Sequence, residues 1–283
     1  MVDKLVEIAD LVIPPNDTSV SGFVYNLIKD WYSGPTGDSQ QERRDSGDGY
    51  FDEVDMDYNG LVVSFEGVCV DYDKVSLARK KARFAALRNN GLSIPVSVTD
   101  PLGKTTRYGK VLSTPIPHTR HLTSFSWAID ILFTDPLRYG DLVSGSTGIP
   151  VATGGRTWPA TWPLLWGGGG NDGRITLTNE GTAPAWPRFR ATGGQAGGFR
   201  VSEVGTGKEI IVNRTIPLGS YVDLDSATES ATIDGPNNNI SGSLSKEEWW
   251  SVGPGETATF QFNPLGDVTG DPQYYAELNH TFQ

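Results

Sequence analysis

The chain has 283 residues, 37% of them hydrophobic, which is enough apolar material for the cores of one large or two ordinary domains. A formal net charge of −11 disfavours non-specific binding to nucleic acid, and a single cysteine, Cys69, excludes an internal disulfide. The 34 glycines and 18 prolines follow no fixed period, which favours many short strands joined by turns over a helical protein.

The N-terminal segment Met1–Pro15 carries three acidic residues and has no long apolar core, so no signal peptide is predicted. No stretch of the sequence approaches the roughly 20 apolar residues that are needed to cross a bilayer. A soluble protein is therefore expected. The single cysteine is compatible with folding in a reducing cytoplasm.

Residues 1–141 are predicted to form the first domain. Within it, residues 30–49 are polar and rich in glycine, which predicts a mobile loop. The apolar run Leu61–Val70, which contains Cys69, predicts a buried strand.

The segment Asp73–Asn90 is the one clear helix in the sequence. Asp73 is a suitable N-cap, and Gly91 after two asparagines is typical of a left-handed C-cap. Small apolar residues recur at helical spacing, and Leu77 and Phe84 lie on nearly the opposite side. The small-residue stripe consists of Val75, Ala78, Ala82 and Ala85.

Two apolar stripes on one helix indicate two packing partners, one of them the domain's own sheet. We assign the second stripe, Leu77 and Phe84, to an interface with a neighbouring subunit, with burial under a loop of the same chain as the alternative. The helix also has a cationic side, predicted to be solvated or to contact acidic loops of a partner. Its members are Lys74, Arg79, Lys80, Lys81, Arg83 and Arg88.

Two strands, Ile94–Thr99 and Thr106–Leu112, flank the turn residues Asp100–Gly103. A longer alternating strand is predicted over Ser124–Phe133. Residues 142–171 then change to a composition dominated by Ser, Gly, Thr and Pro, which predicts a linker between domains. Three evenly spaced tryptophans in it predict packing at the domain junction, namely Trp158, Trp162 and Trp166.

Residues 172–283 consist almost entirely of short strands and turns, as expected of a β-sandwich. The predicted strands are Arg174–Thr178, Arg188–Thr192, Phe199–Val204, Glu209–Val212, Tyr221–Leu224, Ala231–Ile233 and Thr257–Phe262. In the last of these, Ala258, Phe260 and Phe262 are expected to face the core while the intervening polar residues face water.

One motif satisfies the formula of a calcium-binding EF-hand loop: Asp55, Asp57, Asn59 and Gly60, followed by Glu66. An EF-hand loop joins two helices, whereas the residues after Gly60 predict a strand. Asn-Gly between extended residues is also a strong hairpin signal. The hairpin is therefore favoured over the calcium site.

Nothing in the sequence supplies a catalytic site or a cofactor site. A nucleophile elbow is absent, and Cys69 falls in a core strand without a nearby histidine. Gly103-Lys104-Thr105 lacks the preceding glycine of a phosphate-binding loop, and His118 and His121 have no cysteine partner for zinc. An enzyme is not predicted. A rival binding function remains, since Trp186, Trp249 and Trp250 can join the linker tryptophans in stacking on sugar rings.

The order of these features resembles the distal tail proteins of siphophages. The C-terminal half carries the clearest matches, and the N-terminal order of loop, strand, helix, strand pair and long strand also fits. The matching segments are Ile175–Pro184, Pro187–Gly193, Gly207–Ile210, Val222–Asp225 and Trp249–Trp250 before Gly253–Gly255.

This resemblance implies a mainly β protein: a tail-tube-like N-terminal β-sandwich with one helix, then a galectin-like C-terminal β-sandwich. It also implies a homo-oligomeric ring of six copies between the tail tube protein and the tail-tip hub protein. DNA would pass through its channel without specific contacts, and no cofactor or membrane is involved. The expected location is the virion tail tip, after assembly in the bacterial cytoplasm. The galectin sugar contacts do not map onto this chain, and a carbohydrate-binding or host-receptor adhesion module remains the alternative.

Overall fold

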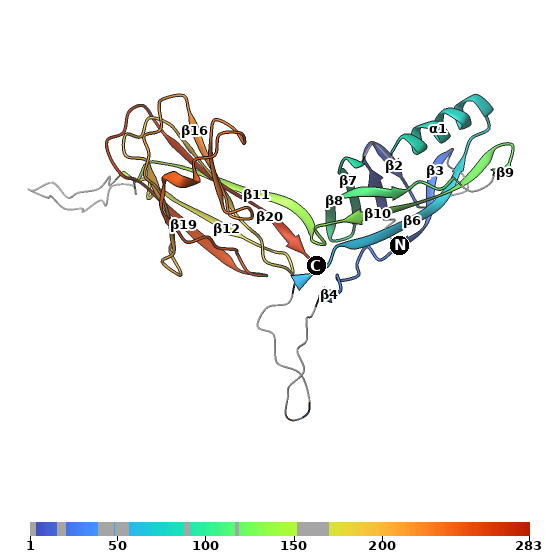
Figure 1. Cartoon of the computed structure of the whole chain (residues 1–283), viewed down its shortest axis with the longest axis horizontal. Coiled ribbons are helices and arrows are strands. Elements are labelled where there is room, and N and C mark those ends of the chain that lie inside the picture. The colour runs from blue at the N-terminus through green and yellow to red at the C-terminus, as the bar shows by residue number, and fades with distance from the viewer. Residues whose placement is uncertain are drawn as a thin grey trace, which may run out of the picture. The chain divides into compact units, whose positions relative to one another are not determined.

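The computed structural model describes residues 4–15, 21–38, 48, 57–87, 91–116, 119–151 and 170–283. The chain divides into two compact units, residues 1–141 with Gln283 and residues 142–282. Both units are built mainly from antiparallel strands, and α1 is the α-helix among the described residues (Figure 1). The predicted mainly β fold with one helix is confirmed.

The first unit consists of two sheet layers that share the long strand β8. Residues 103–109 of β8 pair with β7, which continues to β1 and β2, whereas residues 110–113 of β8 pair with β10, which continues to β6 and β3. The elements are β1 (Leu5–Ile8), β2 (Leu11–Ile13), β3 (Gly22–Lys29), β4 (Gly37–Asp38), β5 (Asp57–Tyr58), β6 (Leu61–Val70), α1 (Lys74–Ala86), β7 (Ile94–Asp100), β8 (Gly103–Ser113), β9 (Thr119–His121), β10 (Ser124–Phe133) and the start of β11 (Arg138–Gly148).

Strands β6 and β10 have the bounds that the sequence predicts, and they pair along their whole length, from Ser124 opposite Val70 to Phe133 opposite Leu61. Every second residue of β10 is buried, as the alternation of apolar and polar residues requires. The buried side chains of this strand pair form one side of the first unit's core.

Helix α1 packs on the buried side of this sheet through its two large apolar side chains. Phe84 is fully buried, with its ring centroid 5.6 Å from that of Phe23 and 5.3 Å from that of Trp127, and Leu77 is also buried. The assignment of Leu77 and Phe84 to a subunit interface is therefore wrong, because the chain's own core covers both. The small-residue stripe, which we expected to face the sheet, is exposed.

The start of α1 is held by a hydrogen-bond network around Asp71 and Asp73. Asp73 caps the helix as predicted and accepts from the backbone amides of Val75 and Ser76. The Asp71 carboxylate accepts from Ser76 Oγ at 2.5 Å and from the Asp73 amide at 2.9 Å, and it lies 2.8 Å from Lys80 Nζ. Lys80 and these donors hold the pKa of Asp71 well below its usual range.

This lowered pKa predicts a pH-dependent contribution of Asp71 to stability. Because the folded state favours the carboxylate, the contribution is complete above the unfolded-state pKa of about 3.9 and is lost as the pH falls through the folded-state value. The difference in unfolding free energy between the wild type and Asp71→Asn should therefore be largest near neutral pH and shrink in acid.

Urea unfolding of both proteins across this pH range measures that difference. Glu66→Gln is the control, since Glu66 is exposed on β6 and forms no ion pair within the described part of the chain. A difference for Asp71→Asn that stays constant from neutral pH into strong acid would contradict the assignment.

The predicted mobile loop over residues 30–49 is wrong at its start. Trp31 is 1% exposed, and its ring centroid lies 6.1 Å from that of Phe65 and 6.0 Å from that of Phe133. Buried Arg107 donates from Nη1 to the Trp31 carbonyl at 2.7 Å, and burial lowers the pKa of this arginine to about 10. Beyond residue 38 the segment lies outside the described residues, apart from position 48.

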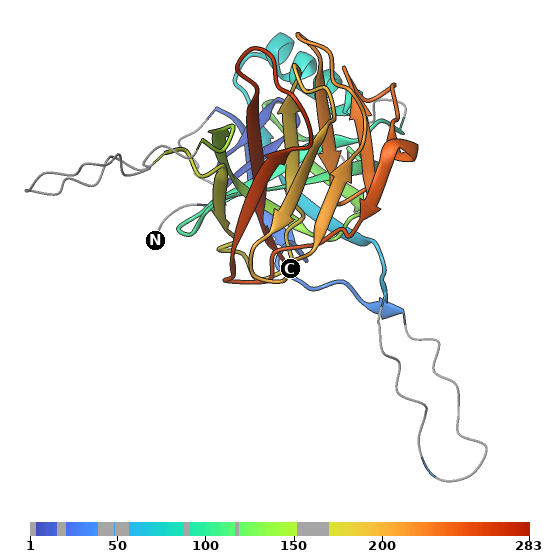
Figure 2. The ribbon, with the colours of Figure 1, turned by 90° about the vertical axis from the view of Figure 1, so that its left-hand side faces the viewer.

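The second unit is a β-sandwich of two layers (Figures 1 and 2). Each layer has five strands, in the orders β17-β16-β13-β20-β11 and β12-β19-β14-β15-β18. The remaining elements are the second half of β11, β12 (Arg174–Thr178), β13 (Arg188–Thr192), β14 (Phe199–Glu203), β15 (Glu209–Val212), β16 (Tyr221–Asp225), β17 (Ser230–Ile233), the short 3₁₀ helix η2 (Ser241–Ser243), β18 (Leu244–Glu247), β19 (Thr257–Pro264) and β20 (Gln273–Phe282).

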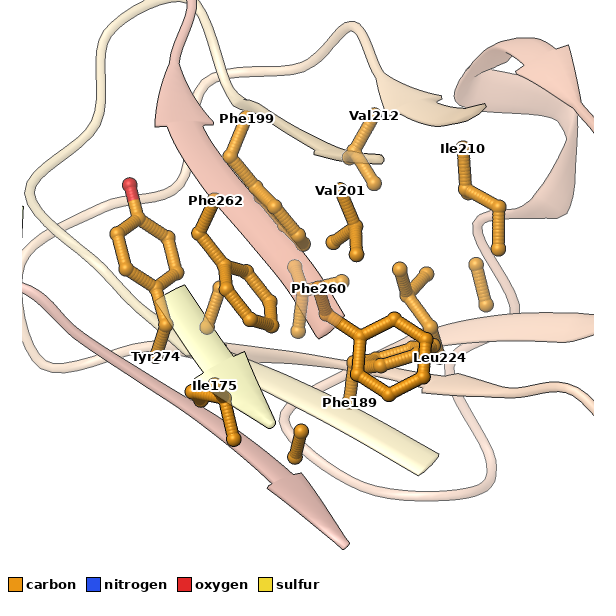
Figure 3. Close-up of a cluster of buried hydrophobic side chains, with 14 of the residues drawn as sticks. Ile175, Phe189, Phe199, Val201, Ile210, Val212, Leu224, Phe260, Phe262 and Tyr274 are labelled. Carbon is orange, nitrogen blue, oxygen red and sulfur yellow. The ribbon is translucent and has the colours of Figure 1, made fainter. Parts of the chain in front are cut away.

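The two layers meet in a core of aromatic and branched aliphatic side chains (Figure 3). Phe260 and Phe262 point inward from β19 with Ala258, as predicted, and the residues between them are exposed or half-buried. The ring of Phe189 packs edge-on against Phe260 at 4.9 Å, and Tyr274 stacks on Phe262 at 5.0 Å. Strands β12 to β16 accordingly alternate between buried residues and more exposed ones.

The predicted linker over residues 142–171 is wrong at its start, because residues 142–148 form the second half of β11. Alternating serines and glycines obscure this strand in the sequence. Asn171 is hydrogen-bonded to the end of β11 and to Val151: it accepts from Thr147 Oγ1 at 2.7 Å through its side chain and from the Val151 amide at 2.8 Å through its carbonyl. Trp158, Trp162 and Trp166, the predicted junction residues, lie outside the described residues.

Candidate functional site

The calcium motif does not assemble in the described part of the structure. Asn59 is exposed just before β6, and Glu66 lies within that extended strand, about 17 Å beyond its first residue. One cation cannot bind both side chains, so the calcium candidate is wrong for this pair. Asp55 lies outside the described residues, and Asp57 is a residue of β5.

The alternative explanation of Asn59-Gly60 as a hairpin is also wrong, because β5 pairs with β4 and not with β6. Lack of space for a side chain, and not a hairpin turn, explains the glycine at position 60. A Cβ atom at this position would lie 2.9 Å from the carbonyl oxygen of Phe133, at the end of β10. Within the described ranges, no group of three or more His, Cys, Asp or Glu side chains is placed to hold a metal ion.

The potential catalytic groups are placed where they have structural roles. Cys69 is fully buried, and burial raises the pKa of its thiol to about 11, so the reactive thiolate is scarce at neutral pH. Gly103 opens β8 at the β7–β8 turn with a φ of +127°, which confirms the hairpin in place of a phosphate loop. Of the histidine pair, His118 lies outside the described residues and His121 is described only as a backbone position of β9.

The described C-terminal tryptophans do not form one sugar-stacking platform. Trp250 is buried, with its ring centroid 6.0 Å from that of Phe260 and 5.8 Å from that of Phe189. Trp249 packs partly buried against the same core, and Trp186 is 37% exposed. Trp250 therefore stabilises the sandwich and is unavailable to a ligand.

Helix α1 presents a basic outer face in an acidic protein. Lys74 and Lys81 are seven residues apart, so they lie on the same side of the helix as the exposed stripe of small residues. Within the described residues neither forms an ion pair, whereas Lys80 pairs with Asp71 and Arg83 pairs with Asp10. This face, defined by Lys74, Val75, Ala78, Lys81, Ala82 and Ala85, combines two free cations with side chains short enough for close approach.

The second unit carries a hollow of about 1020 Å³ on the outer side of the β17-β16-β13-β20-β11 layer. Two arginine–aspartate pairs cross it. Arg190 donates from Nε and Nη2 to the two carboxylate oxygens of Asp223, at 2.6 and 2.9 Å, and Arg188 donates from Nε to Asp225 at 3.1 Å. The hydrogen bonds that Arg190 donates to Asp223 raise the pKa of this arginine. The hollow was missed in the sequence, because it is formed by strands that are distant along the chain.

No helix in the described part of the chain is long and apolar enough to cross a membrane.

The cationic helix residue Arg88 lies outside the described residues.

Comparisons with known proteins agree with the resemblance drawn from the sequence. Residues 180–269 match the model of the siphovirus-type tail component family, C-terminal domain. The resemblance to siphophage tail components is thereby confirmed for this part of the chain. No curated protein matches the chain.

Solved structures extend the similarity of fold to nearly the whole chain. The Dit protein of phage SPP1, described as a hub of the adsorption apparatus in phages infecting Gram-positive bacteria, aligns with a TM-score of 0.67 and 12% identity over 99% of both chains. A chain of the phage P2 baseplate in its activated conformation with Ca aligns with a TM-score of 0.51 and 9% identity over 100% of this chain and 99% of that one. A chain of the same baseplate with Sr gives 0.52 and 9% over 97% of each.

Proposed function

We propose that this protein is a structural component of a siphophage tail tip that closes into a ring of six copies between the tail tube and the tail-tip hub. The observation that carries the proposal is the family match over residues 180–269, together with a fold like that of a tail hub protein over 99% of the chain. The ring leaves a channel through which DNA passes, and the protein acts by assembly without turnover.

The absence of a catalytic role in this proposal is supported by the placement of the reactive groups. Cys69 is inaccessible, and the described residues bring no three metal-ligating side chains together. The free, buried thiol also suits assembly in the reducing cytoplasm of the host before the protein takes its place in the virion.

The basic outer face of α1 is our candidate for one side of the contact between copies. A closed ring needs a heterologous interface, in which one surface of each subunit meets a different surface of the next. The chain has 34 acidic against 23 basic residues, so acidic groups elsewhere on the next copy can face Lys74 and Lys81. Short side chains between these cations allow the backbones to approach.

The mass of the purified protein in solution tests the ring. Light scattering at increasing concentration should reveal a species of six times the 30.6 kDa chain. Association through Lys74 and Lys81 should weaken as salt is added, because exposed charges are screened over about 8 Å at physiological ionic strength. A protein that remains a monomer both alone and with its tail tube protein would contradict the proposal.

Charge reversal on α1 should prevent the ring without unfolding the subunit. The double substitution Lys74→Glu and Lys81→Glu should shift the light-scattering mass to the monomer, while the unfolding free energy of the subunit stays within about 0.5 kcal/mol of the wild type. Lys208→Glu with Arg214→Glu is the matched control, since it adds the same charge to exposed positions of the second unit. A ring that persists after reversal on α1 would exclude this face.

A further inference from the structure

The hollow on the second unit is lined by one layer of outward-facing side chains from five neighbouring strands, β11, β13, β16, β17 and β20. The pairing of β13 with β16 and β20 places the charged residues of the hollow in two rows across the sheet. Arg190 on β13 lies opposite Asp223 on β16 and opposite Tyr275 on β20. In the next row, Arg188 lies between Asp225 and Glu277 in the same way. Each arginine therefore sits in the middle of the sheet with polar or aromatic neighbours on both sides.

Arg190 is fixed in place by its neighbours. Two of its N–H groups are bound by Asp223, and its guanidinium carbon lies 4.5 Å from the ring centroid of Tyr221. A guanidinium has five N–H donors, and an ionised carboxylate has acceptor sites for about four hydrogen bonds. After their mutual pairing, both groups retain capacity for a ligand, and the pair offers donors and acceptors side by side in a fixed geometry.

The charges in the hollow nearly cancel. Arg188 and Arg190 are balanced by Asp223 and Asp225, and Glu277 leaves a single negative charge in excess. A phosphate or a nucleic acid requires unpaired cations, which this surface does not offer. The centres of protein–protein interfaces are on average depleted of charged residues, whereas here two charged pairs occupy the middle of the surface, which disfavours a protein partner.

The edges of the hollow add hydroxyl groups and an aromatic face. Ser144 and Ser146 of β11 lie at one side, and Ser230 and Thr232 of β17 lie at the other. Tyr275, which is 42% exposed, lies beside Arg190 and provides an apolar ring surface among polar groups. The ligand that fits is neutral, rich in hydroxyl groups and able to place an apolar C–H face against a tyrosine.

We propose that this hollow binds a neutral oligosaccharide, with the Arg190–Asp223 pair hydrogen-bonded to adjacent hydroxyl groups of one sugar and Tyr275 stacked against its ring. Arg190 donates to one hydroxyl oxygen while Asp223 accepts from the neighbouring hydroxyl group, so one residue pair recognises two positions of the ligand. The tryptophans that the sequence suggested for sugar stacking take no part. This activity is separate from ring formation, since no residue of α1 contributes to it.

Isothermal titration of the full-length protein with a panel of neutral oligosaccharides tests the proposal. The panel comprises glucose-, galactose-, rhamnose- and N-acetylglucosamine-based chains, and a sulfated oligosaccharide is the charged comparator. Saturable binding of at least one neutral member is expected. Arg190→Gln and Tyr275→Ala should each lower its affinity by about tenfold or more without changing the thermal unfolding midpoint.

Each variant has a matched control in the first unit. Arg83→Gln removes an arginine from the exposed pair with Asp10, and Tyr108→Ala removes an exposed tyrosine from β8; neither should change the affinity. The proposal is overturned if no neutral member binds at about 10 mM, a concentration that detects even weak millimolar affinity. It is also overturned if only the sulfated chain binds, or if Arg190→Gln and Tyr275→Ala leave binding intact.

Discussion

Replacing Phe84 by alanine should destabilise the first unit by about 3–5 kcal/mol, the usual cost of removing a fully buried phenylalanine ring. The ring is 0% exposed and contacts Phe23 and Trp127, so its loss leaves a cavity beneath α1. Urea unfolding, followed by the near-ultraviolet signal of the buried tryptophans, measures the change. In a domain of ordinary stability, a loss of this size leaves a substantial unfolded fraction.

Val75→Ala is the matched control on the same helix. Val75 is 59% exposed, so its truncation should change the unfolding free energy by no more than about 0.5 kcal/mol. The two variants separate two explanations of Phe84. A core residue lowers the stability of the isolated subunit, whereas an interface residue would lower the mass of an assembly and leave the monomer stable. Little loss of monomer stability in Phe84→Ala would restore the interface assignment.

The inward side of α1 was predictable from the amount of apolar surface on each stripe. Leu77 and Phe84 bury far more apolar area than one valine and three alanines, and the stabilisation by burial grows with that area. A count of apolar positions instead favours the small-residue stripe as the side facing the sheet, because it gives an alanine the same weight as a phenylalanine. The cap at Asp73 depended only on local chemistry, and it was predicted correctly.

Strands were predictable where the period of two was long and regular. β10 alternates over ten residues and was found with its bounds intact, whereas β1 and β2 have four and three residues and gave no usable pattern. β20 does alternate, with Tyr274, Ala276 and Leu278 buried, but it follows a turn-rich stretch and was overlooked. Short strands depend on distant partners for their stability, so their own residues carry little signal.

The hollow on the second unit was not predictable from the sequence for a different reason. Arg190 and Asp223 are 33 residues apart, and Tyr275 lies a further strand away in the sheet. A shift of one residue in the pairing of β13 would turn Arg190 into the core and destroy the arrangement. Register is set by the whole sandwich, so the site exists only after the fold has formed.

A second tertiary feature of this unit involves Asn179 and Gly181, which belong to the segment that resembles siphophage proteins. The Asn179 amide donates to the carbonyls of Ala183 at 2.8 Å and Val252 at 3.0 Å, and its oxygen accepts from the Gly181 amide at 3.0 Å. A Cβ atom on Gly181 would lie 1.9 Å from the Thr281 carbonyl oxygen, so only glycine fits there. Asn179 and Gly181 together therefore hold the turn after β12 against the end of β20.

Asn179→Ala should lower the unfolding free energy of the second unit by about 3 kcal/mol or more, since several buried backbone groups lose their partner together. Asn179→Asp keeps the shape but opposes a carboxylate to the Ala183 and Val252 carbonyls, so it should be at least as destabilising near neutral pH. Asn213→Ala, at an exposed asparagine after β15, should change stability by less than about 0.5 kcal/mol. Urea unfolding measures all three, and a loss below about 1 kcal/mol in both Asn179 variants would show that water replaces the side chain at no great cost.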